Sequence, residues 1–107
     1  MTDNEKNQIL FMHFVMSLSH AGMMQLGKVM NPVTNKIEKN LAEAKSTIDM
    51  LVMLREKTKN NLDKNEEQFL ASSISSLQLN YVDEVEAEKQ KLDNQKPQES
   101  ENKEPQN

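Results

Sequence analysis

The chain has 107 residues, with 13 Lys and Arg side chains against 17 Asp and Glu, for a net charge of −4. This length allows one domain, and the absence of cysteine excludes disulfides, thiolate catalysis and thiolate metal sites. Residues 1–82 are neutral and the excess acid lies in residues 83–107, while Arg55 is the only arginine, so the charge pattern excludes a nucleic-acid-binding protein. The acidic, polar start lacks the positive segment of a secretory signal, and we therefore expect a cytoplasmic protein.

The first predicted element is a helix over residues 3–28, which begins at a capping box formed by Thr2 and Glu5. It contains the segment 7–27, which has no charged side chain. On a helical wheel one face carries a stripe that is predicted to enter the core: Phe11, Phe14, Val15, Leu18, Gly22 and Leu26. The adjacent face is also apolar, so this helix is expected to have more than one buried neighbour.

Residues 28–40 are predicted to form a turn between two helices. Pro32 suits the first central position of a turn, and Asn31 can accept a hydrogen bond from the backbone two residues further on. Asn35 can adopt the left-handed conformation that usually requires glycine. The short arms 29–30 and 36–37 could pair weakly as a small hairpin.

A second helix is predicted over residues 41–60, with Asn40 and Glu43 as its N-terminal cap. Its core stripe consists of Leu41, Ala44, Ile48, Leu51 and Val52. Asp49 allows two interpretations. It can form a local pair with Lys45, or it can be a carboxylate at a helix junction that accepts a hydrogen bond from the turn at 31–35.

A third helix is predicted over residues 64–88, where Asp63 and Glu66 form another capping box. Its narrow core-facing seam contains Leu70, Ile74, Leu77 and Tyr81. Ser72, Ser73, Ser75 and Ser76 mark either a solvent face or a place where another helix comes close. Residues 1–85 are thus the predicted helical domain, and residues 86–107 form an acidic tail that is expected to be mostly disordered.

Methionine is abundant, with eight residues in the chain. Methionine fills gaps in cores and also lines grooves that accept varied apolar helices. We predict an interface between copies of the chain, formed by Met12, Met16, Met23, Met50, Met53 and Leu54. The alternatives are a methionine-lined binder of apolar segments and a peripheral membrane adaptor that uses the first helix.

The sequence does not indicate an enzyme, a metal site or a bound cofactor. His13 and His20 lie seven residues apart, whereas two metal ligands on one helix need a spacing of three or four. No serine lies in a nucleophile elbow, and the only glycines, Gly22 and Gly27, do not make a phosphate-binding loop. The histidines are interpreted as interface or surface residues.

The turn Asn31-Pro32-Val33-Thr34 and the following stretch NLAEAKSTIDMLVMLREKTKNNL (residues 40–62) resemble a bacterial family of small helical proteins. That family is known only as a domain of unknown function. Its usual pattern has an acidic residue before the proline and a glycine after the threonine, where this chain has Asn31 and Asn35. The resemblance covers roughly residues 11–82 and implies a helical fold and a bacterial origin, with no site to carry over.

The sequence therefore predicts an all-α three-helix unit, in which helices 2 and 3 form an antiparallel hairpin and several copies assemble as a bundle. The expected function is that of a non-enzymatic interaction or scaffolding module. Its expected partners are a second copy of the chain and an unidentified protein, without nucleic acid and with a membrane as the weaker alternative.

Overall fold

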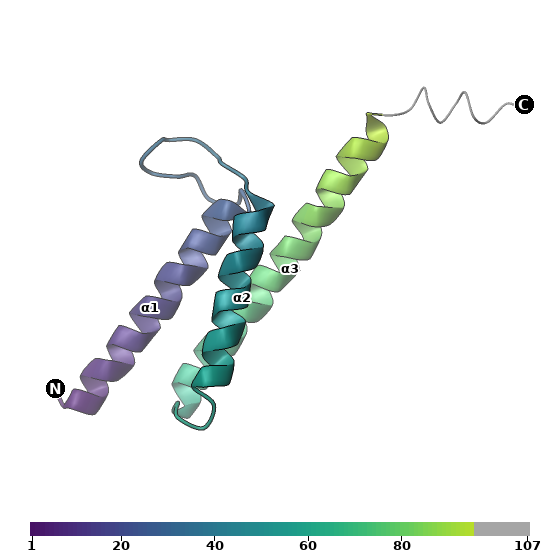
Figure 1. Ribbon diagram of the computed structural model, residues 1–107. Coiled ribbons are helices and arrows are strands. Elements are labelled where there is room, and N and C mark those ends of the chain that lie inside the picture. The colour runs from purple at the N-terminus through teal and green to yellow at the C-terminus, as the bar shows by residue number, and fades with distance from the viewer. Residues whose placement is uncertain (96–107) are drawn as a thin grey trace, which may run out of the picture.

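The structure, a computed structural model, describes residues 1–95 and contains three α-helices: α1 (Asp3–Gln25), α2 (Leu41–Lys57) and α3 (Lys64–Asn94). The described residues contain no β-strand, which confirms the all-α class. Each helix packs against the other two, and the last turns of α3 project beyond α1 and α2 (Figure 1). No helix within residues 1–95 is long and apolar enough to cross a membrane.

The helices begin where the sequence predicts, because each start is determined by a local cap. Thr2 and Asp63 form capping boxes with Glu5 and Glu66, and the side chain of Asn40 accepts a hydrogen bond from the backbone N–H of Glu43. These bonds satisfy backbone donors that have no partner inside the helix.

The helix ends were predicted less well. α1 ends at Gln25 rather than at residue 28, because Gly27 adopts a positive φ of 78° and closes the helix. The Gly27 N–H donates to the Met24 carbonyl and the Lys28 N–H to the Met23 carbonyl, which is the Schellman arrangement. α2 ends at Lys57 rather than at 60, and α3 continues to Asn94 rather than stopping at 88. Residues 86–94 of the predicted tail are therefore helical, and the remainder from 96 onward lies outside the described residues.

The core lies along the axis between the three helices. It is formed by eight buried apolar residues: Val15, Leu26, Ala44, Ile48, Leu51, Leu70, Ile74 and Leu77. All eight belong to the stripes that the sequence predicts. Thr47 is also buried, and its hydroxyl donates a 2.6 Å hydrogen bond to Oε1 of Gln25, which joins α2 to the end of α1.

The connection between α1 and α2 has the turn chemistry that its asparagines predict. Oδ1 of Asn31 accepts a hydrogen bond from the backbone N–H of Val33 at 2.9 Å, and Asn35 has a positive φ of 58°. The expected pairing of the arms 29–30 and 36–37 was wrong in register. A single antiparallel bridge joins Asn31 to Lys36 instead, because the turn closes immediately around these two residues.

Candidate interaction surface

Large apolar side chains are exposed beside the border between α1 and α2. The side of α2 that carries Thr47 faces α1, because Thr47 bonds to Gln25 there. Met50 and Leu54 follow Thr47 on that side of α2, while Phe14 and Leu18 lie on the side of α1 that carries Gln25. Beside this border three large side chains are about half exposed: Leu10 (54%), Phe14 (53%) and Met50 (45%). We call these three residues the α1/α2 apolar surface.

Phe14 corrects the sequence prediction, which placed it in the core with Phe11 and Val15. Phe14 lies at the edge of the stripe, where α2 does not cover it completely, so its ring remains about half exposed. Leu10 was not singled out at all. The available signal was its position four residues before Phe14, which extends the same exposed edge by one helical turn.

Three of the six predicted interface residues lie on α1 and three lie on α2. Met12 and Met23 line hollows between α1 and α3, the first together with Ile9 and Phe69. Met16 is half exposed in a shallow hollow on α1 alone. Met50, Met53 and Leu54 all lie on α2, where Leu54 is partly buried against the core.

The four predicted serines fit both interpretations that the sequence left open. Ser72, Ser73 and Ser76 line the hollows beside Met12 and Met23, where α1 comes close to α3. Ser75 is exposed. Small side chains at these positions allow the methionines of α1 to lie between the two helices.

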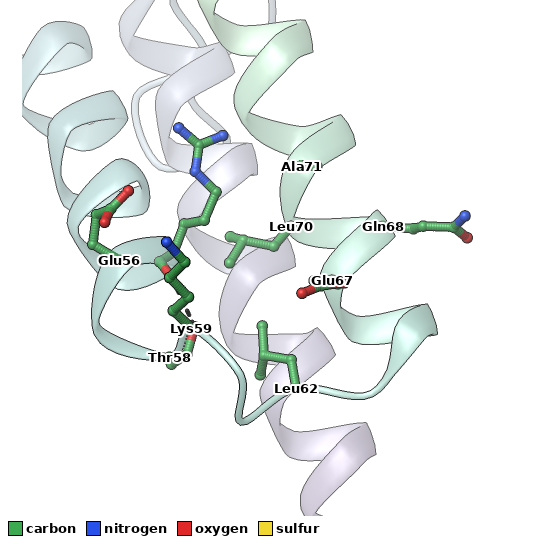
Figure 2. A pocket seen from close by; sticks show the side chains of 9 residues that line it. Glu56, Thr58, Lys59, Leu62, Glu67, Gln68, Leu70 and Ala71 are labelled. Atoms are coloured by element: carbon green, nitrogen blue, oxygen red, sulfur yellow. Dashed lines mark hydrogen bonds between the residues drawn. The ribbon is translucent and has the colours of Figure 1, made fainter.

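A separate hollow of about 390 Å³ lies where α2 ends and α3 begins. Leu62 and Leu70 supply its apolar part, while Gln68 points away from it (Figure 2). Its charged residues have both signs: Arg55 and Lys59 against Glu56 and Glu67. The Thr58 hydroxyl donates to the Leu54 carbonyl at 2.8 Å, which satisfies a carbonyl at the end of α2.

The remaining candidates for chemistry lie on the surface. His13 and His20 are exposed and share their shallow hollow with Met16 and Ser17. Asp49 forms an exposed pair with Lys45 at 3.2 Å, which confirms the local interpretation, and the proposed bond to the turn at 31–35 was wrong. Among residues 1–95 no group of three or more His, Cys, Asp or Glu is arranged to hold a metal ion.

An ion-pair cluster that the sequence did not predict joins the α1–α2 connection to α3. Nζ of Lys28 lies 2.6 Å from Oε2 of Glu84, and Nζ of Lys39 lies 2.8 Å from oxygens of both Glu84 and Glu88. The available signal was the spacing of four between Glu84 and Glu88, since like charges at that spacing repel unless cations lie nearby. The cluster positions the loop against the far half of α3.

Hydrogen bonds within the cluster change the pKa of its members. Those from Lys28 and Lys39 lower the pKa of Glu84 below its ordinary 4.5, and the bond from Lys39 lowers that of Glu88. Bonds to the two carboxylates raise the pKa of Lys39 above 10.5. The cluster therefore stabilises the fold fully between about pH 4.5 and 10.5, and loses this effect as the pH falls through the lowered carboxyl pKa or rises through the raised lysine pKa.

We expect Glu84→Gln to lower the free energy of unfolding at pH 7 by about 1 kcal/mol, since two partly exposed ion pairs are lost. At pH 3 the difference should shrink, because protonation of Glu84 weakens these pairs in the wild type, while the variant lacks them at every pH. Urea unfolding followed by circular dichroism at the two pH values measures this. Glu86→Gln, at an exposed position without an ion pair in residues 1–95, is the control, and an equal loss at both pH values would contradict the assignment.

Comparison with known proteins adds one match. No curated protein and no solved structure matches the chain. A model of the family described as a domain of unknown function (DUF1844) matches residues 8–84, which include all of α2 and most of α1 and α3. This range covers well over half of the chain and agrees with the resemblance found in residues 11–82. The protein therefore belongs to the DUF1844 family, a family without an assigned function.

Proposed function

We propose that the protein is a non-enzymatic interaction or scaffolding module of the cytoplasm that works as a small homo-oligomer. In this proposal α2 and α3 form an antiparallel hairpin, α1 packs on it, and the units assemble as a helical bundle. The observation that supports it is the α1/α2 apolar surface, where three large side chains remain about half exposed in a single copy.

A second copy of the chain is the occupant that this surface favours. Within residues 1–95 the core has only eight buried apolar residues, and small domains often gain the missing stability by oligomerisation. A two-fold contact would place Phe14 of one copy against Met50 of the other, and the reverse contact follows by symmetry, so that each apolar side chain is covered. An unidentified protein could then bind the assembled module.

The alternative is a methionine-lined holder of apolar segments, which could also serve as a peripheral membrane adaptor through α1. It is supported by the hollow between α1 and α3, whose lining includes Ile9, Met12 and Phe69. Methionine is flexible enough to fit segments of different shape. In that case the protein would be a monomer until an apolar peptide or a lipid surface is added.

Light scattering after gel filtration tests the proposal. The expected mass of the wild-type protein is a multiple of the 12.3 kDa chain mass, and it should decrease on dilution toward the dissociation constant. A stable 12.3 kDa species with a helical circular dichroism spectrum across the micromolar range would contradict the homo-oligomer and favour the alternative.

A further inference from the structure

The outer side of α3 carries an apolar area that neither α1 nor α2 covers. Leu79 is 65% exposed and Val82 is 60% exposed, more than any other large apolar side chain within the three helices. Both lie away from the core seam of Leu70, Ile74 and Leu77 on the helical wheel. Leu79 and Val82 are therefore oriented toward solvent and are available to a partner.

Other exposed residues on the same side of α3 form a stripe that runs along the length of the helix. We call it the α3 stripe. Eight exposed residues recur at helical spacing along it: Lys64, Gln68, Ala71, Ser75, Val82, Glu86, Lys89 and Asp93. Ala71 and Ser75 are small, which would let another helix approach the first half of the stripe closely. The second half, around Val82, is bulkier and reaches the part of α3 that projects beyond the other helices (Figure 1).

From this stripe we propose that α3 pairs with α3 of a second copy in antiparallel orientation, with the two-fold axis passing near Leu79. The register that places Lys64 opposite Asp93 of the second copy also places Ser75 opposite its Val82. The small half of each stripe then receives the bulky half of the other. Each two-fold pairing is self-complementary, as a contact between identical chains requires.

Charge distinguishes this orientation from the parallel one. Lys64 and Asp93 take part in no ion pair within residues 1–95, and they lie at opposite ends of α3. Antiparallel pairing brings Lys64 of one copy to Asp93 of the other, twice in each dimer. Parallel pairing in register would instead place the two Lys64 side chains beside each other and the two Asp93 side chains beside each other. Like charges at such short range are unfavourable.

The α3 stripe is distinct from the α1/α2 apolar surface, so this inference goes beyond the proposed function. Two different two-fold contacts on one chain build a closed tetramer when their axes cross at right angles. The loss of either contact should then leave a dimer, and the loss of both should leave a monomer.

Site-specific cross-linking tests the pairing, because the chain contains no cysteine of its own. We expect Leu79→Cys to form a disulfide-linked dimer under mild oxidation, since a residue beside the two-fold axis meets its counterpart within the roughly 4.4–6.8 Å Cα separation that a disulfide needs. Thr34→Cys, at an exposed position in the connection between α1 and α2, should remain largely unlinked. Linkage of Leu79→Cys at no more than the level of this control would overturn the proposal.

Mixed variants determine the orientation. Ser75→Cys and Val82→Cys should form a cross-linked heterodimer when mixed, and each should link poorly when it is alone. Efficient linkage of each variant to itself would show parallel pairing and overturn the antiparallel register. Similarly, Lys64→Glu and Asp93→Lys should each weaken association several-fold, and the double variant should restore it, because the two positions meet only between copies.

The result also separates this inference from the proposed function. If Leu79→Cys links while Phe14→Asp/Met50→Asp keeps the wild-type mass, the α3 pairing stands and the α1/α2 contact fails. If the double variant loses mass while Leu79→Cys stays unlinked, the α3 pairing fails and the proposed function stands. Circular dichroism on every variant confirms that the helices remain folded.

Discussion

Replacing Gly22 with valine is expected to lower the free energy of unfolding by about 1–3 kcal/mol. Gly22 is buried where α1 crosses the other two helices, and a Cβ atom there would lie 2.9 Å from Cδ2 of Leu77 and 3.4 Å from Cγ2 of Thr47. Leu77 belongs to the buried core, so its packed neighbours must absorb any movement of its side chain. Valine adds two methyl groups beyond this Cβ and therefore separates the helices.

Alanine at the same position should have a much smaller effect, because two terms oppose one another. Its Cβ presses on the end of the Leu77 side chain, while a helix interior favours alanine over glycine by about 1 kcal/mol. Ala87→Val, at an exposed helical position, is the control for the helix propensity of valine. Chemical denaturation should show that the wild type and Gly22→Ala have a higher free energy of unfolding than Gly22→Val. A Gly22→Val protein as stable as the Ala87→Val control would show that the helices can separate freely here.

The features that the sequence predicted correctly depend on residues close together in the chain. The capping residue Thr2 lies three positions from its partner, and the turn residue Asn31 bonds to the backbone of Val33. The core stripes follow from helical periodicity alone. Such features require no knowledge of how the helices are placed relative to one another.

The features that the sequence did not predict depend on contacts between distant segments. The ion pair of Lys39 with Glu84 spans 45 positions, and nothing local to either residue indicates it. The exposure of Phe14 likewise depends on how far α2 reaches across α1. The length of α3 was underestimated because composition alone suggested a disordered tail, whereas the cluster at Glu84 and Glu88 holds this part of the helix beside the α1–α2 connection.

The exposed apolar residues of the three-helix unit are separate from the residues that form its core. The buried stripes of all three helices are already used inside the unit. Leu10, Phe14 and Met50 add nothing to that core, and a single copy of the chain gains little from keeping them together beside one border. Their common position is therefore best explained by a contact that forms outside the single chain.

This contact predicts the largest effect on assembly. We expect Phe14→Asp/Met50→Asp to weaken self-association by more than about a hundredfold, because truncating central interface residues typically costs about 2–4 kcal/mol each and a buried carboxylate without a partner costs more. Both positions are about half exposed in the single chain, so the monomer should tolerate the substitutions and keep its helical spectrum. Light scattering across a dilution series measures the change in mass.

The control must add the same charge at another place. Thr34→Asp/Ala87→Asp introduces two carboxylates at exposed positions outside both the α1/α2 apolar surface and the α3 stripe, and it should retain the wild-type mass. If both double variants dissociate equally, the added negative charge is the cause and the α1/α2 surface has no special role. If only Phe14→Asp/Met50→Asp dissociates, then the border between α1 and α2 is the site where the copies meet.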